Sequence, residues 1–217
     1  MNNRDYKCFA ADEVFHVYNR GVNKMDIFND EQDLEIFLCR MKENLFPELM
    51  GKDKKSKSIA RRKLLPVGAY DLLSYCLMKN HFHFLIRQNT ELPITQFILK
   101  VCTGYSKYFN KKYGRVGAVF QDRCRAVRIQ KNEQLLWTSF YIHNNPKKAG
   151  IVDKLSDYKW GSYLDYIGLR DGIICKKEII LEQFNSQDSY SRWFEDPKLS
   201  MEIEGNLIGN QDLLIDY

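Results

Sequence analysis

The sequence predicts an α+β fold in which helices pack on an antiparallel β-sheet. Segments rich in β-branched and aromatic residues alternate with segments whose apolar residues recur at helical spacing. The order is strand, helix, strand, strand, helix, strand, helix, and polar residues, glycine or proline separate the segments. With 217 residues and 44% hydrophobic content, the chain can bury one core of ordinary domain size.

The first strand is predicted over residues 13–19, which are followed by a turn at Arg20-Gly21. A helix is predicted next, capped by Asn29 or Asp30 and extending to about Phe46, because large apolar residues recur there at helical spacing. Residues 47–66 are basic and contain few large apolar side chains. We expect a loop in that segment.

The central part of the chain predicts a hairpin and a second helix. Two apolar runs, residues 67–78 and 82–87, are separated by Lys79-Asn80-His81, which indicates an antiparallel hairpin. The second helix is predicted from about Ile94 to Tyr113, with a proline in its first turn and a glycine after its end.

A short strand over residues 126–129 and a third helix over residues 133–145 complete the pattern. Asn132 can cap this helix, and Pro146 is expected to end it because proline has no backbone N–H. The element order is that of a ferredoxin-like sheet with an additional C-terminal helix.

We expect one domain over residues 1–175, with its core at about 13–150, followed by an acidic extension over residues 176–217. Residues 160–166 are expected to pack back on the domain. The extension is predicted to form one amphipathic helix and a poorly ordered acidic end.

Charge is distributed unevenly along the chain. The net charge is +5, but residues 178–217 contain nine acids and two bases, so that their −7 leaves +12 for residues 1–177. Residues 52–63 contain seven bases and one acid, and residues 100–128 contain eight and one. Such segments commonly contact phosphate groups, although a solvated loop explains residues 52–63 equally well.

The six cysteines are scattered without a Cys-x-x-Cys pair, which is typical of reduced thiols and disfavours a structural zinc finger. No apolar run approaches the roughly 20 residues that cross a bilayer, and residues 1–5 lack the apolar core of a signal peptide. We therefore expect a cytoplasmic, nucleoid-associated protein of bacterial type with no membrane partner.

Two residue pairs suggest a chemical site. His81 and His83 share one face of a predicted strand, about 7 Å apart at Cα, where two imidazoles can bind one cation. Tyr141 and Asn145 share one face of the third predicted helix and offer a nucleophilic phenol and an oxygen ligand. The alternative for His81 and His83 is that they are polar residues on a solvated strand. Tyr141 could instead be a core aromatic residue and Asn145 a helix-terminal amide, and spacing alone favours these two alternatives.

Six motifs follow one another in order: Phe15-His-Val-Tyr-Asn-Arg-Gly21, Asp26-Ile-Phe28, Met78-Lys-Asn-His-Phe-His-Phe-Leu-Ile86, Gly117-Ala-Val-Phe-Gln-Asp-Arg123, Tyr141-Ile-His-Asn-Asn-Pro-Lys-Lys-Ala-Gly150 and Trp160-Gly-Ser-Tyr163. Together they resemble the single-tyrosine HUH transposases. More narrowly, they resemble the REP-associated tyrosine transposases, which are akin to transposases of insertion-sequence-200-like elements. One departure is Gly161, where many relatives have serine.

The resemblance implies a metal-dependent enzyme that cleaves and rejoins single-stranded, hairpin-forming DNA. His81 and His83 match the HUH histidines, and Asn145 matches the amide that completes a Mg²⁺ or Mn²⁺ site. Tyr141 matches the catalytic tyrosine, which forms a 5′-phosphotyrosine with the DNA. A homodimer is compatible with this assignment, because relatives differ in whether the tyrosine helix completes its own site or a partner's.

Basic and polar residues near the motifs are expected to hold DNA phosphates, and an anchored turn is the alternative for Arg20. His16 is expected to be structural, and His143 to face away from Tyr141. A domesticated protein that binds hairpins without cleavage is the alternative function, and a zinc hydrolase is disfavoured because further nearby ligands are missing. The DNA-binding candidates are Asn19, Arg20, Lys107, Lys111, Lys112, Arg115, Arg123 and Arg125.

Overall fold

The centre of the molecule is a four-stranded antiparallel sheet with the strand order β2-β3-β1-β4. The structure is a computed structural model and describes residues 10–52 and 64–196. The predicted ferredoxin-like α+β fold is confirmed. The strands are β1 (Glu13–Arg20), β2 (Tyr70–Met78), β3 (His81–Gln88) and β4 (Arg125–Ile129).

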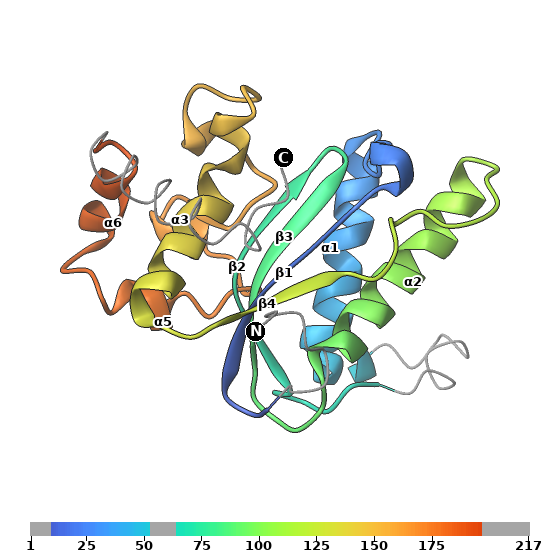
Figure 1. The fold of residues 1–217 in the computed structure, drawn as a ribbon, viewed down its shortest axis with the longest axis horizontal. Coiled ribbons are helices and arrows are strands. Elements are labelled where there is room, and N and C mark those ends of the chain that lie inside the picture. Colours follow the sequence, from blue (N-terminus) through green and yellow to red (C-terminus); the bar gives the residue numbers. More distant parts are fainter. Residues whose placement is uncertain (1–9, 53–63, 197–217) are drawn as a thin grey trace.

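Helices cover both faces of this sheet. Helices α1 and α2 lie on one side, and α3, α5 and α6 lie on the other (Figure 1). The helices are α1 (Glu31–Leu45), α2 (Ile94–Lys112), α3 (Asn132–Lys148), α4 (Tyr163–Tyr166), α5 (Glu178–Leu181) and α6 (Gln187–Trp193), with short 3-10 helices η1 (Val22–Lys24), η2 (Pro47–Lys52) and η3 (Leu155–Asp157).

The sheet separates two hydrophobic cores, because alternate side chains of a strand point to opposite faces. Val17, Phe82 and Phe84 belong to the core that α1 and α2 cover. Leu85 and Val127 belong to the core on the α3 side. Burial of each such side chain stabilises the fold by about 1.5–3 kcal/mol, so both helical layers hold the sheet in place.

The hairpin between β2 and β3 is tighter than the sequence suggested. Its turn is Lys79-Asn80, and His81 is the first residue of β3 rather than part of the connection. His81 is paired with Met78 of β2 on one side and with Arg20 of β1 on the other. Because both neighbouring strands pair with His81, β3 begins at this residue.

The predicted boundaries of the first two long helices are confirmed. Asp30 is the N-cap of α1, and its side chain accepts a hydrogen bond from the backbone N–H of Asp33 at 3.0 Å. Helix α2 begins after Pro93 and ends before Gly114, which has a φ of +60°. Glycine adopts this left-handed conformation readily, so it ends the helix.

The prediction that Pro146 ends the third helix was wrong. Pro146 lies inside α3, which continues to Lys148 and starts at Asn132, with Lys131 rather than Asn132 as its N-cap. Proline removes one backbone donor, but the last turn keeps other hydrogen bonds: Ala149 N–H donates to Asn145 O at 2.9 Å. One missing bond near the end of a packed helix is therefore tolerated.

The C-terminal prediction of one amphipathic helix was also wrong. The described part of this segment forms two short helices, because Ser186 caps α6 and accepts a hydrogen bond from Ser189 N–H at 3.1 Å. Tyr190 and Phe194 are buried, and the Phe194 ring stacks on Phe140 of α3 at a centroid distance of 4.5 Å. Helix α6 therefore packs on α3.

Two predicted features lie outside the described residues. They are the acidic end, which falls in residues 197–217, and most of the basic loop, which falls in residues 53–63. Within the described ranges, no helix is both long and apolar enough to cross a membrane.

Candidate functional site

Strands β1 and β3 place a row of polar side chains on the sheet face that α3 covers. Tyr18 is directly opposite His83, and Arg20 is directly opposite His81. Directly paired residues in antiparallel strands share a face, and so do residues two positions apart in one strand. His16 therefore lies on this face as well, diagonal to His83.

His83 is in the centre of this row and is fully buried. Its Nδ1 lies 3.0 Å from Nε2 of His16, and the two ring planes are nearly parallel at 18°, with centroids 5.3 Å apart. Its Nε2 is buried and has no hydrogen-bond partner among the described residues. A buried polar atom without a partner is costly, and ligand binding commonly explains one.

His81 lies beside His83, with ring centroids 5.0 Å apart and rings nearly perpendicular at 87°. Its Nδ1 is 2.6 Å from the side-chain oxygen of Asn80, and its Nε2 is buried. Both histidines therefore use Nδ1 for a hydrogen bond within the protein. Nε2 is then the ring nitrogen by which each could bind a cation.

Helix α3 brings Tyr141 onto the histidines. The Tyr141 ring meets the His83 ring edge-on at 5.4 Å and 89°, and the His16 ring at 5.9 Å and 77°. Asn145 follows one helical turn later, is buried, and donates a hydrogen bond from Nδ2 to Tyr141 O at 2.8 Å. Because that bond occupies the amide nitrogen, Asn145 would bind a cation through Oδ1.

Burial keeps the central histidines neutral. Burial, followed by the neighbouring His81 and His16, lowers the pKa of His83 well below its ordinary value of 6.5. Burial also lowers the pKa of His16 to about 3. A metal ligand needs a neutral imidazole, so His83 is in the required form at neutral pH.

The donor atoms fit a small divalent cation. Two imidazole nitrogens and an amide oxygen suit Mn²⁺, and Mg²⁺ less well, and the buried Nε2 of His83 lies where such an ion would satisfy it. No group of three or more His, Cys, Asp or Glu side chains that could hold a metal occurs in residues 10–52 and 64–196. Asn145, one turn after Tyr141 on α3, is the candidate for a third protein ligand through its amide oxygen.

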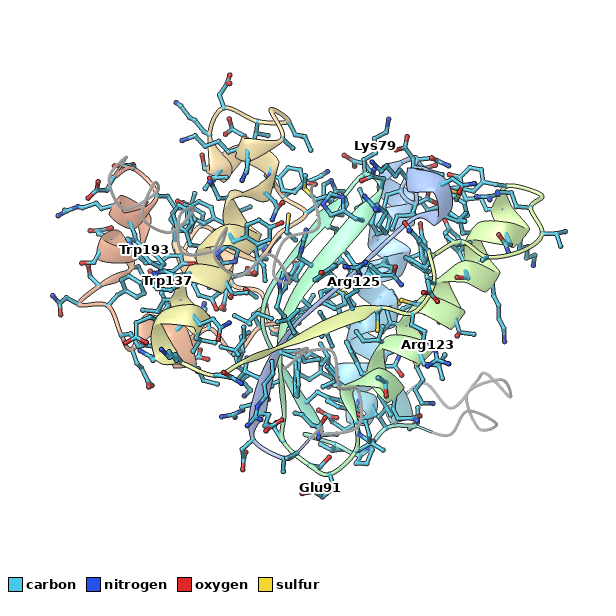
Figure 2. All side chains as sticks on the ribbon, viewed as in Figure 1. Lys79, Glu91, Arg123, Arg125, Trp137 and Trp193 are labelled. Atoms are coloured by element: carbon cyan, nitrogen blue, oxygen red, sulfur yellow. The ribbon has the colours of Figure 1, made fainter. Side chains whose placement is uncertain are left out.

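Two of the basic candidates lie on the same sheet face as the histidines. Arg20 is paired with His81, and its Nε donates to Gln121 Oε1 at 3.2 Å. Arg125 is exposed and is paired with Tyr18 across the β1–β4 ladder. In the view of Figure 2, Arg125 lies between the two helical layers. The structure thus brings Arg20 and Arg125 to the border of the site.

The candidates on and after α2 lie in the other helical layer. Lys107 and Lys111 are exposed there. Lys112 Nζ forms ion pairs with Asp30 at 2.7 Å and with Asp33 at 2.8 Å. Arg115 lies over the Phe109 ring, 5.7 Å from its centroid. The structure does not bring these four residues to the histidine face.

Asn19 and Arg123 complete the predicted set. Asn19 is buried, and its Oδ1 accepts a hydrogen bond from Arg20 N–H at 2.8 Å. It is paired with Phe82 and alternates with Tyr18 and Arg20 along β1, so it lies on the opposite face of the sheet. Arg123 is exposed and lies toward α2 in Figure 2. Neither residue lies beside the histidines.

His16 is the residue whose place sequence reasoning missed. It was expected to be structural, yet its imidazole contacts those of His83 and Tyr141. The signal that could have found it is its alternation with Tyr18 on one strand face, but the register between β1 and β3 was needed to join it to His83. His143 bonds instead to Tyr190 and Ser162, away from this group.

Comparisons with known proteins indicate a family and a fold for this chain. The family model described as "Transposase IS200 like" matches residues 36–145, a segment that includes both histidines, Tyr141 and Asn145. A solved structure described as "Structure of the REP associates tyrosine transposase bound to a REP hairpin" is 14% identical, with a TM-score of 0.52, and the match covers 74% of this chain and 81% of that chain. At 14% identity, the similarity to this structure shows that the two chains share a fold. A search of curated proteins found no match.

Proposed function

The chain belongs to the family of IS200-like transposases, and from this premise we propose that it cleaves and rejoins single-stranded DNA with Tyr141 as its nucleophile. The observation that carries the proposal is the edge-on contact of the Tyr141 ring with the buried His83 ring at 5.4 Å. Nucleophile and cation-binding nitrogens would then face the same phosphate. A hairpin-forming DNA strand is the expected partner, in keeping with the hairpin named in the matched structure.

In the proposed reaction, the Tyr141 hydroxyl attacks phosphorus of the scissile phosphodiester. The P–O bond to the 3′ oxygen breaks, and the 5′ phosphate remains on Tyr141. The hydroxyl of Tyr141 loses its proton, and the departing 3′ oxygen takes one up, so the step balances. The phosphotyrosine keeps the energy of the broken bond. A 3′-hydroxyl can therefore attack it later and seal a new strand without ATP.

His81, His83 and Asn145 would hold a divalent cation, which when bound offsets the negative charge of the phosphate. His83 is buried and neutral and its Nδ1 is hydrogen-bonded to His16, so its Nε2 is the nitrogen that would bind the cation. Arg20 and Arg125 would hold neighbouring phosphates, because their strand positions border the histidine row.

A covalent adduct tests this function. The full chain is incubated with Mn²⁺ and a pool of single-stranded hairpin oligonucleotides, and a denaturing gel detects DNA bound covalently to protein. Tyr141→Phe should abolish the adduct, because phenylalanine has no hydroxyl. Tyr113→Phe, in the α2 layer, is the matched control and should keep it.

The outcomes distinguish DNA cleavage by Tyr141 from hairpin binding without cleavage. An adduct that survives Tyr141→Phe would show that another residue is the nucleophile. Tight hairpin binding by the wild type with no adduct on any hairpin would favour a protein that binds DNA without cleaving it.

A further inference from the structure

His16 has one polar contact that explains its place in the core. It is fully buried, and its Nε2 lies 3.0 Å from His83 Nδ1. Its other nitrogen, Nδ1, is buried and forms no hydrogen bond with the described residues. Burying a polar side chain costs free energy that a hydrogen bond offsets. An apolar side chain would pack on this face at lower cost, so the imidazole is explained by His83.

The hydrogen bond between the two rings has two arrangements. A neutral imidazole carries one proton and one lone pair. If the proton of His83 is on Nδ1, it is donated to Nε2 of His16, and the lone pair of His83 is on Nε2. If His16 donates instead, the proton of His83 is on Nε2, and that nitrogen cannot bind a cation.

We propose that His16 is a positioning residue that accepts the Nδ1 proton of His83, keeps the lone pair on His83 Nε2 and holds the ring in place for a divalent cation. The proposal rests on the metal site of the proposed function. It assigns to a histidine in β1 the role that a hydrogen-bond acceptor has behind many metal-binding histidines.

The relative orientation of the rings supports the positioning role. The His16 and His83 ring planes are nearly parallel at 18°, and Tyr141 meets both rings edge-on. His16 therefore also supports the Tyr141 ring. Replacing it would loosen the position of the nucleophile as well as that of the ligand.

The first test measures Mn²⁺ binding to the full chain without DNA, by electron paramagnetic resonance titration. His16→Leu should weaken binding by roughly 10- to 100-fold, the usual effect of losing such an acceptor. His16→Gln should recover most of the affinity, because its carbonyl oxygen can accept the same proton.

Gln88→Leu is the control for a general loss of stability. Gln88 is a fully buried residue of the same strand as His83, on the opposite face, and its Oε1 accepts a hydrogen bond from Ile94 N–H at 3.0 Å. Its replacement should lower the melting temperature and leave the Mn²⁺ affinity unchanged.

The second test needs no variant of His16. Nitrogen-15 NMR of the histidine rings in the metal-free wild type reports which nitrogen carries the proton, and His83→Ala identifies the signals of His83. We expect the proton of His83 to be on Nδ1 in the metal-free protein. A proton on Nε2 would overturn it, even if every His16 variant failed to fold.

The outcomes distinguish this proposal from the function on which it rests. Wild-type affinity for Mn²⁺ in His16→Leu, together with its loss in His83→Ala, would overturn the role of His16 and leave the metal site standing. Absence of Mn²⁺ binding by the wild type would overturn the metal site itself, and the role of His16 with it.

Discussion

His16 and His143 are buried histidines that are not proposed as ligands, and their ring nitrogens make different hydrogen bonds. Both ring nitrogens of His143 have hydrogen-bond partners within the fold: Tyr190 OH lies 2.7 Å from Nδ1, and Ser162 Oγ lies 2.7 Å from Nε2. His16 has one such bond, and it joins His83. His143 therefore stabilises the packing of α3, whereas His16 serves the site.

His143 makes stability depend on pH. Burial, with a smaller effect of Arg170, lowers its pKa from 6.5 to about 3. Below pH 6.5 the unfolded chain takes up a proton that the folded chain does not bind, so stability falls as the pH falls from 6.5 toward 3. We expect His143 to contribute a slope of about 1.4 kcal/mol per pH unit in this window.

Urea unfolding of the metal-free protein at pH 7, 6 and 5 measures this slope. In His143→Gln the slope should be smaller by the contribution of this one residue, whatever the stability of the variant at pH 7. An unchanged slope would show that His143 is protonated in the folded protein.

At the scale of elements, α3 is attached to the sheet by a chain of buried hydrogen bonds. Ser162 Oγ accepts from Tyr75 N–H of β2 at 2.9 Å and lies next to His143 of α3. Tyr190 of α6 continues the chain through His143 Nδ1 and through Ser139 Oγ at 3.2 Å. The C-terminal helices thus help to hold the helix that carries the proposed nucleophile.

Tyr190→Phe tests this attachment. The change keeps the packed ring but removes the hydroxyl, which leaves His143 Nδ1 buried without its hydrogen-bond partner. We expect the free energy of unfolding to fall by about 1–3 kcal/mol, measured by urea denaturation. The dependence on urea concentration should stay the same, because the surface exposed on unfolding hardly changes. Unchanged stability would contradict a structural role for this bond.

At the scale of the whole molecule, the sheet divides the protein into two layers of different character. The layer of α1 and α2 carries four of the basic candidates, and one of them, Lys112, is paired with Asp30 and Asp33. The histidine row lies on the other face, bordered by Arg20 and Arg125. A DNA strand that reaches Tyr141 would therefore meet these two arginines.

Arg125→Ala should weaken binding of single-stranded DNA by lowering the number of phosphates neutralised. For one contact, the slope of log affinity against log salt concentration should become shallower by about 0.7. Fluorescence anisotropy with a labelled hairpin between 50 and 200 mM salt, roughly the range in which such contacts are resolved, measures it.

Arg192→Ala is the matched control for this change. Arg192 is an exposed arginine of α6, at the edge of the α3 layer (Figure 1), and its loss alters the net charge equally. Its slope should equal that of the wild type. Equal effects of both variants would indicate a response to net charge rather than a phosphate contact at Arg125.

Much of the fold was predictable because its signals are local. Asp30 caps α1 and Gly114 follows α2, as the sequence predicted, because capping and left-handed backbone depend on a few neighbouring residues. Pro146 misled the prediction because a packed helix tolerates the loss of one terminal hydrogen bond. The C-terminal segment was predicted as one helix, but it forms two, α5 and α6, and Ser186 caps the second.

By itself, the sequence determined the order of the elements and placed His81 with His83, and Tyr141 with Asn145, on common faces, since both periodicities are properties of a single strand or helix. Only the tertiary structure decided that Tyr141 lies against His83, and that His16 is the hydrogen-bond partner of His83 across 67 positions of sequence. The physical reason is that strand register and helix packing depend on how both hydrophobic cores close around the sheet, which no short segment of the chain encodes.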